Sequence, residues 1–419
     1  MATDYFPIIA THLIFLISIY LILASIEVRT ELDKYLVTGF LAHITIGLIL
    51  WNSRNINIGD ARGFVTYGRR YADYLNGNPL KPLLVNGKEG WPKLLGHIFR
   101  LFGYVPEVAI YLNALFLCLA AVFVHLACQE LSIHTEKPVA ALLILYVPAS
   151  IYWGSLPGRE PLCWLFISMM VYSASRLVKK IDAVPILVLA FATIGMFPIR
   201  GSIALGLLGT FVASIGLSSS IGRIGVVERR VLAFLVVAIA APPALHRVNT
   251  QALGGSSAGE LKVLLSDANS SFVSEGEVSQ SVLSFSTLKS IPNVTLGPLP
   301  WEWRPSLFLA IIDAIFWALL WYTIYQGVKR TKRFDVFKLY VFPAAIMIVT
   351  MAATLGNYGI VMRMRGLMIP ILAPMVALAF IDGTLKDTLK LNKKRVQLKT
   401  QDDKKVSVSQ ETASELESL

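Results

Sequence analysis

The chain has 419 residues, of which 55% are hydrophobic and only 16% charged, and its mean hydropathy is +0.61. Such a composition excludes an ordinary soluble domain, which would carry more charge. The formal net charge of +11 does not indicate a nucleic-acid partner, because Lys and Arg lie between apolar runs rather than clustering on one soluble face.

Apolar runs of 16 to 22 residues recur along the whole chain, and each is close to the length that a helix needs to cross hydrocarbon. Strands of a membrane barrel would instead alternate in polarity over about ten residues. The sequence therefore predicts an all-α polytopic membrane protein, with residues 1–385 as a single transmembrane domain. About eleven spans are expected, at 6–26, 36–51, 107–128, 138–153, 161–178, 183–198, 201–218, 231–245, 306–327, 337–355 and 366–385. The pair 183–198 and 201–218 is separated by two residues, so it could also be one broken element.

The distribution of basic residues predicts the orientation. One set of loops (27–34, 131–137, 179–182, 219–230, 328–335 and the tail after 385) holds 20 Lys and Arg. The positive-inside rule places this set in the cytoplasm, with the N-terminus outside and the C-terminus inside. The tail 386–419 begins basic and ends polar, which is typical of a disordered extension. We expect the chain in the cell (inner) membrane, with the lipid bilayer as a partner.

The other set of loops is then outside, and two of its members are long: 52–106 and 246–305. Within the first, residues 64–75 place Phe64, Tyr67, Tyr71 and Tyr74 on one helical face, and residues 91–103 have a similar pattern. Both segments are typical of amphipathic helices that lie at the membrane interface.

Candidate site residues fall on this outer side. Asp60, in NIGDARGF, could serve as a general base, as a metal ligand, or as a helix cap. Arg159 and Glu160 precede Pro161 at the start of a span, where the helix N-terminus favours anions; the alternative is an interfacial Arg–Glu pair. Arg200 lies between two apolar runs, either as a functional charge or reaching to headgroups.

Two further motifs belong to the same side. Arg363 and Arg365, in GNYGIVMRMRG, could hold a phosphate or diphosphate through forked hydrogen bonds. The run PLPWEWRP supplies Trp301, Glu302 and Arg304; its tryptophans could stack on sugar rings or belong to the aromatic belt of the membrane. The six histidines and three cysteines show no metal-ligand spacing.

On the segments GDARGFVTYGRRYADYLNG, PASIYWGSLPGREPL, GPLPWEW and GNYGIVMRMRGLMIP, the chain resembles the bacterial GT-C-type membrane glycosyltransferases. This group includes protein mannosyltransferases and aminoarabinose transferases, and the nearest resemblance is to family-39-like or RgtA/B/C/D-like proteins of envelope polysaccharide pathways. One extra N-terminal span would place the first outer loop after the second span rather than the first.

The resemblance implies a GT-C-like fold, a polyprenyl-phosphate-linked sugar as donor, and a glycan or lipid acceptor on the non-cytoplasmic face. It implies that Asp60 is the catalytic base and that Arg363, Arg365, Arg159 and Arg200 bind the donor phosphate. For sugar and acceptor binding we name Trp301, Glu302, Arg304, Glu160, Tyr67 and Tyr71. No cofactor is singled out, and a divalent metal beside Asp60 stays open. A polysaccharide polymerase or ligase and a lipid-linked sugar flippase or transporter are the alternatives.

Overall fold

The structure is a computed structural model that describes residues 9, 12–17, 19–20, 32–53, 59–78, 89–217, 285–354 and 358–381. Over these residues the fold is helical, apart from one isolated bridge between Thr135 and Ile381. Six of the helices are long and apolar enough to cross a membrane, or seven if a bent pair near the C-terminus counts as one span. The described residues therefore confirm an all-α, membrane-type protein. They contain fewer candidate spans than the eleven predicted for the whole chain.

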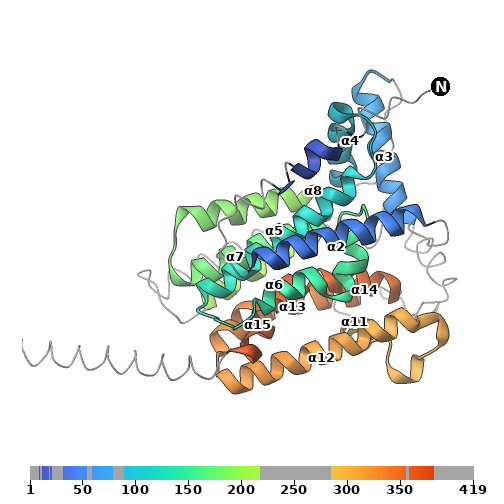
Figure 1. Cartoon of the computed structure of the whole chain (residues 1–419). Coiled ribbons are helices and arrows are strands. Elements are labelled where there is room, and N and C mark those ends of the chain that lie inside the picture. The colour runs from blue at the N-terminus through green and yellow to red at the C-terminus, as the bar shows by residue number, and fades with distance from the viewer. Residues whose placement is uncertain are drawn as a thin grey trace, which may run out of the picture.

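Five predicted spans correspond closely to single helices. They are α2 (Asp33–Asn52), α5 (Val108–Glu130), α7 (Glu160–Lys179), α12 (Phe308–Thr331) and α13 (Phe334–Thr354). Most of these helices run side by side in Figure 1. α5 and α7 form the centre of this bundle, since most of their apolar residues are fully buried. The helices at the periphery expose more of theirs, as a surface in contact with lipid would.

One predicted span is a broken helix, and another begins at a bend between two helices. The segment 138–153 forms α6 (Val139–Tyr146) and then a π-helical turn, η1 (Ser150–Gly154). Pro148 lies in the break, where it cannot supply a backbone donor. The segment 366–385 follows α14 (Tyr358–Gly366) and begins with α15 (Ile369–Ala377), continued by η4 (Leu378–Phe380); α14 and this second part are bent by 58°. The continuous apolar run of residues 138–153 gives no sign of its break.

Helix α8 (Ala183–Leu217) covers the two segments that the sequence left as two spans or one broken element. Its backbone is non-helical at Arg200 (φ −152°, ψ 67°), two residues after Pro198. Arg200 lies beside Glu160, the first residue of α7, whereas Phe211 packs on Tyr340, whose hydroxyl bonds Ser175 about four turns further along α7. The second half of α8 therefore runs back along the first, with the turn at Arg200.

The two predicted amphipathic segments are helices that pack on each other. They are α3 (Gly59–Leu75) and α4 (Gly90–Phe102), which stand together at one end of the bundle (Figure 1). Gly68 and Gly96 lie at their crossing: a Cβ added to Gly96 would lie 2.6 Å from the Tyr71 ring and 2.9 Å from the Gly68 carbonyl. The absence of these side chains lets the two helices approach closely.

The described loops lie at the two ends of the bundle. At one end, Arg333 donates to the carbonyl of Leu131, and Thr135 pairs with Ile381, so the loops 131–137 and 328–335 meet. At the opposite end, which we call the site end, lie the start of α3, the loop 155–159, the turn at Arg200 and helix α14. The same end carries α11 (Phe285–Leu296), η2 (Pro300–Glu302) and η3 (Pro305–Leu307).

Several predictions lie outside the described residues. They are the span 231–245, most of the span 6–26, the outer-loop residues 246–284 and the tail 386–419.

Candidate functional site

One carboxylate at the site end is surrounded by three guanidinium groups. Glu160 Oε1 accepts hydrogen bonds from Arg363 Nε at 2.7 Å and from Arg200 Nη2 at 3.0 Å. Arg159 Nε lies 3.9 Å from the same oxygen. The carboxylate side chain is only 3% exposed, and the three arginine side chains are between 8% and 13% exposed. We call these four residues the arginine cluster; it unites three of the four predicted phosphate-binding arginines.

The cluster is assembled from three helices that are far apart in the sequence. Arg159 precedes α7 and Glu160 is in its first turn, followed by Pro161, whose fixed φ suits that position. Arg200 comes from the turn of α8, and Arg363 from the last turn of α14. The N-terminus of α7 adds partial positive charge at the same place.

The charges of the cluster do not balance. Burial, with the positive charge of Arg200 acting in the same direction, lowers the pKa of Arg159 to about 9, which still leaves it protonated at neutral pH. Three guanidinium groups and one carboxylate give a net charge of +2. Among the described residues, the buried Nε atoms of Arg159 and Arg200 have no hydrogen-bond partner. Buried donors without partners indicate a missing acceptor, and an anion would supply it.

The loop 155–159, which carries Arg159, is held by three neighbouring helices. His43 of α2 hydrogen-bonds the Ser155 hydroxyl at 2.9 Å. Asn113 of α5 donates to two carbonyls of the loop, and the indole of Trp91 on α4 donates to a third at 3.2 Å. All three side chains are buried. They fix the approach of Arg159 and Glu160 to the cluster.

Two aromatic rings lie against the arginines. The Arg159 guanidinium is 5.7 Å from the centre of the Phe64 ring, and that of Arg363 is 5.5 Å from the Trp153 ring. Both distances suit cation–π attraction, which stabilises a charge removed from water. The rings hold the planar groups in place without satisfying their N–H donors.

Asp60 is the second residue of α3, and the structure describes its backbone but not its side chain. Its neighbour Ala61 packs in a small buried group with Leu156, and Phe64, one turn further along α3, faces Arg159. The start of α3 therefore lies beside the loop that carries Arg159 and Glu160. No group of three or more His, Cys, Asp or Glu side chains that could hold a metal occurs among the described residues.

Arg365 is not part of the arginine cluster. Its Nη1 lies 3.4 Å from Asp313 Oδ2, and its Nη2 donates to the carbonyl of Gly297. The two side chains of this ion pair are 1% and 3% exposed. α14 is a helix, in which residues i and i+2 point about 200° apart, so Arg363 and Arg365 face different partners and do not form the predicted joint grip.

Glu302 organises the turn around Pro300 instead of joining the cluster. It accepts a hydrogen bond from the Tyr358 hydroxyl at 2.6 Å and from the Leu299 backbone amide at 2.8 Å. Trp301 is 79% exposed beside it, and Arg304 is exposed as well. The indole of Trp301, in the predicted sugar-binding run, therefore points away from the protein. Lipid or a ligand can contact it there.

Both predicted tyrosines lie on α3, and Tyr71 contacts α4. Tyr71 is half-buried, with its ring edge-on to His97 of α4 at 5.6 Å and tilted against Tyr74 at 6.2 Å. Tyr67, one turn earlier, is half-buried too. The contacts of Tyr71 join α3 to α4.

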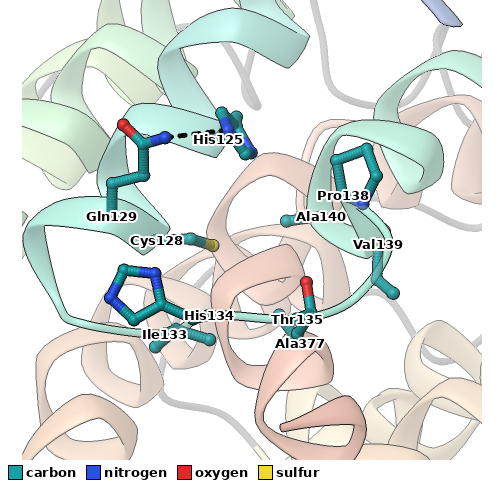
Figure 2. Close-up of a pocket in the computed structure, with 10 residues that line it drawn as sticks. All are labelled: His125, Cys128, Gln129, Ile133, His134, Thr135, Pro138, Val139, Ala140 and Ala377. Atoms are coloured by element: carbon teal, nitrogen blue, oxygen red, sulfur yellow. Dashed lines mark hydrogen bonds between the residues drawn. The ribbon is translucent and has the colours of Figure 1, made fainter. Parts of the chain in front are cut away.

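Figure 2 shows a pocket beside the loop 131–137, which lies at the opposite end of the bundle from the cluster. It is formed between the end of α5, the following loop, the start of α6 and Ala377 of α15. His125 and Gln129 share a hydrogen bond of 3.0 Å on its wall, and the Cys128 side chain lies between His125 and His134 (Figure 2). The pocket is thus separate from the candidate site.

Sequence reasoning missed four residues that matter here: His43, Asn113, Trp153 and Asp313. The sequence does point to His43, Asn113 and Asp313, because each is a polar residue within an apolar span. Such residues are costly in a membrane unless they are paired. No such signal exists for Trp153, because its ring contacts Arg363, more than 200 positions away.

Comparisons with known proteins returned nothing: no family model matches the chain, and no curated protein or solved structure matches it either.

Proposed function

We propose that the chain is a membrane glycosyltransferase. It moves a sugar from a polyprenyl-phosphate donor to an envelope glycan or lipid acceptor. The reaction takes place on the non-cytoplasmic face of the inner membrane, where the site end lies. The N-terminus is outside, the C-terminal tail is cytoplasmic, and the full chain has eleven spans in a GT-C-like arrangement. The observation that carries this proposal is the buried arginine cluster with its net positive charge and unpartnered donors, next to the helix that bears Asp60.

The chemistry follows from these groups. The acceptor hydroxyl oxygen bonds to the anomeric carbon, and the bond from that carbon to the donor phosphate oxygen breaks. The electron pair leaves with the phosphate, which gains one negative charge, and the hydroxyl proton passes to Asp60. Arg200 and Arg363, at the more open side of the cluster, stabilise the departing phosphate. Trp301 offers an exposed ring face for a sugar.

A transporter of lipid-linked sugars is the second candidate. It is favoured by the interrupted helices at the site end, since transporters place substrate between half-helices. Such a protein would move its substrate across vesicle membranes without forming a covalent product. A polymerase or ligase acting on diphosphate-linked glycans would differ from the leading proposal in the length of the chains that it makes.

The test uses cells that lack the gene and carry variants of the full chain. Asp60→Asn and Arg363→Ala, present at normal levels in the membrane, should fail to complete the glycan and should accumulate the lipid-linked donor. Asp73→Asn is the matched control, because this exposed carboxylate lies on the same helix α3. Completion of the glycan by the Asp60 and Arg363 variants would exclude the proposed function.

A further inference from the structure

The arginine cluster contains a negative charge that a simple phosphate site does not need. A carboxylate competes with phosphate for the same guanidinium groups, so on its own it weakens anion binding. Glu160 nevertheless lies at the centre, within 3.0 Å of both Arg200 and Arg363. Its position needs a separate explanation from that of the arginines.

Glu160 holds the arginines together when no anion is bound. Three guanidinium groups from separate helices repel one another at low dielectric, and only an opposite charge among them keeps them close. The geometry uses one oxygen: Oε1 accepts both short hydrogen bonds, and Arg159 approaches the same atom. Among the described residues, Nε of Arg159 and Nε of Arg200 have no hydrogen-bond partner, so both can donate to a ligand.

Glu160 also sets the net charge that a ligand meets, which is +2 for the four residues together. A lipid monophosphate at neutral pH carries about two negative charges, and a diphosphate carries about one more. A sugar-bearing phosphodiester carries one. The net charge of the cluster therefore matches the charge of the lipid monophosphate that leaves after transfer better than the charge of the phosphodiester donor that enters. Stronger binding of the leaving group lowers the barrier to the reaction.

We propose that Glu160 is a positioning residue that pre-assembles the three arginines and makes the site selective for lipid monophosphate over lipid diphosphate. This inference rests on the proposed function. It assigns the monophosphate class of lipid carrier to the site and disfavours diphosphate-linked glycans as substrates.

The experiment measures the affinity of the purified full chain for farnesyl phosphate and farnesyl diphosphate, which share one apolar tail. The wild type should bind the monophosphate more tightly. Glu160→Gln raises the net charge to +3 and should move the ratio of the two dissociation constants about tenfold toward the diphosphate. Glu160→Asp keeps the charge and should restore the wild-type ratio, which a purely structural role would not require.

Two further variants keep the test decisive. Glu89→Gln removes a carboxylate that pairs with Lys93 on the surface of α4, and it should leave the ratio unchanged. If Glu160→Gln does not fold, Arg200→Gln lowers the net charge to +1 and should move the ratio further toward the monophosphate. An unchanged ratio in the folded Glu160 or Arg200 variant overturns this inference alone. Failure of the wild type to bind either probe overturns the proposed function as well.

Discussion

Arg363 Nε donates a 2.7 Å hydrogen bond to Glu160 Oε1, and this contact joins residues 203 positions apart in the chain. It links the short helix α14 to the start of α7 and brings a third cation to one carboxylate. In the sequence, Arg363 and Glu160 belong to two unrelated motifs; in the fold they belong to one cluster.

Replacement of Arg363 should reduce sugar transfer more than it reduces stability. Arg363→Ala should lower the transfer rate by about 100-fold, the loss typical of one removed donor at a developing negative charge. Arg363→Lys restores the charge without the planar fork and should recover only part of the rate. The assay is transfer from a polyprenyl-phosphate sugar by protein in nanodiscs. Arg70→Ala, at an exposed position of α3, should match the wild type. A wild-type rate for Arg363→Ala would remove this residue from the site.

The buried pair of Asp313 and Arg365 should matter for folding. Asp313→Asn leaves Arg365 charged without its partner and should cost about 3–5 kcal/mol. The double variant Asp313→Leu with Arg365→Met removes both charges and should recover most of that loss. Thermal unfolding in detergent measures these effects. Lys93→Gln, which breaks an exposed pair with Glu89, should cost less than about 1 kcal/mol. Equal costs for the buried and the exposed pair would contradict this assignment.

Gly47 should tolerate no side chain. A Cβ at this position of α2 would lie 2.5 Å from the Ser155 carbonyl oxygen and 2.5 Å from Ile110 Cγ2. Gly47→Ala should therefore displace the loop that carries Arg159, with a stability cost of about 1–3 kcal/mol and a lower transfer rate. Gly63→Ala is the control, because no atom lies within 4 Å of its added Cβ, and the change should stabilise α3 slightly. Thermal unfolding measures the stability of both variants, and the nanodisc assay measures their transfer rates.

Asn113 should be sensitive to a change of one atom. Asn113→Asp keeps the shape but replaces the amide donor, which bonds two loop carbonyls, with a carboxylate oxygen that repels them. Loss of the anchor should lower transfer by about tenfold and destabilise the fold by about 1–3 kcal/mol. Asn52→Asp, at the exposed end of α2, should have little effect on either measurement. A stable, active Asn113→Asp protein would show that the loop holds its position without this side chain.

The sequence predicted the helices well where one apolar run makes one helix, as for α5 and α7. It failed where a proline interrupts a run, since Pro148 divides the segment 138–153, and it did not predict helix α14, which precedes the bend at the start of the last span. The segment 138–153 reads as continuously apolar, because hydropathy does not record backbone direction. The turn of α8 was left open for the same reason.

The sequence predicted which residues belong to the candidate site better than it predicted how those residues are arranged. Asp60, Arg159, Arg200 and Arg363 follow from local motifs, the charge count and the family resemblance, and the last three converge on one carboxylate. Glu160 was assigned to sugar binding, since nothing local indicates that two distant arginines bond it. Arg365 was grouped with Arg363 because the helical register of α14 was not foreseen.

The order in which the chain is made gives the cluster a further consequence. During synthesis Arg159, Glu160 and Arg200 enter the membrane long before Arg363 has been translated. At that stage Glu160 already has Arg159 and Arg200 as cationic partners, so the first half of the bundle can be inserted stably before Arg363 is present. The last helices then complete the cluster, and a chain truncated before α14 would reach the membrane without Arg363.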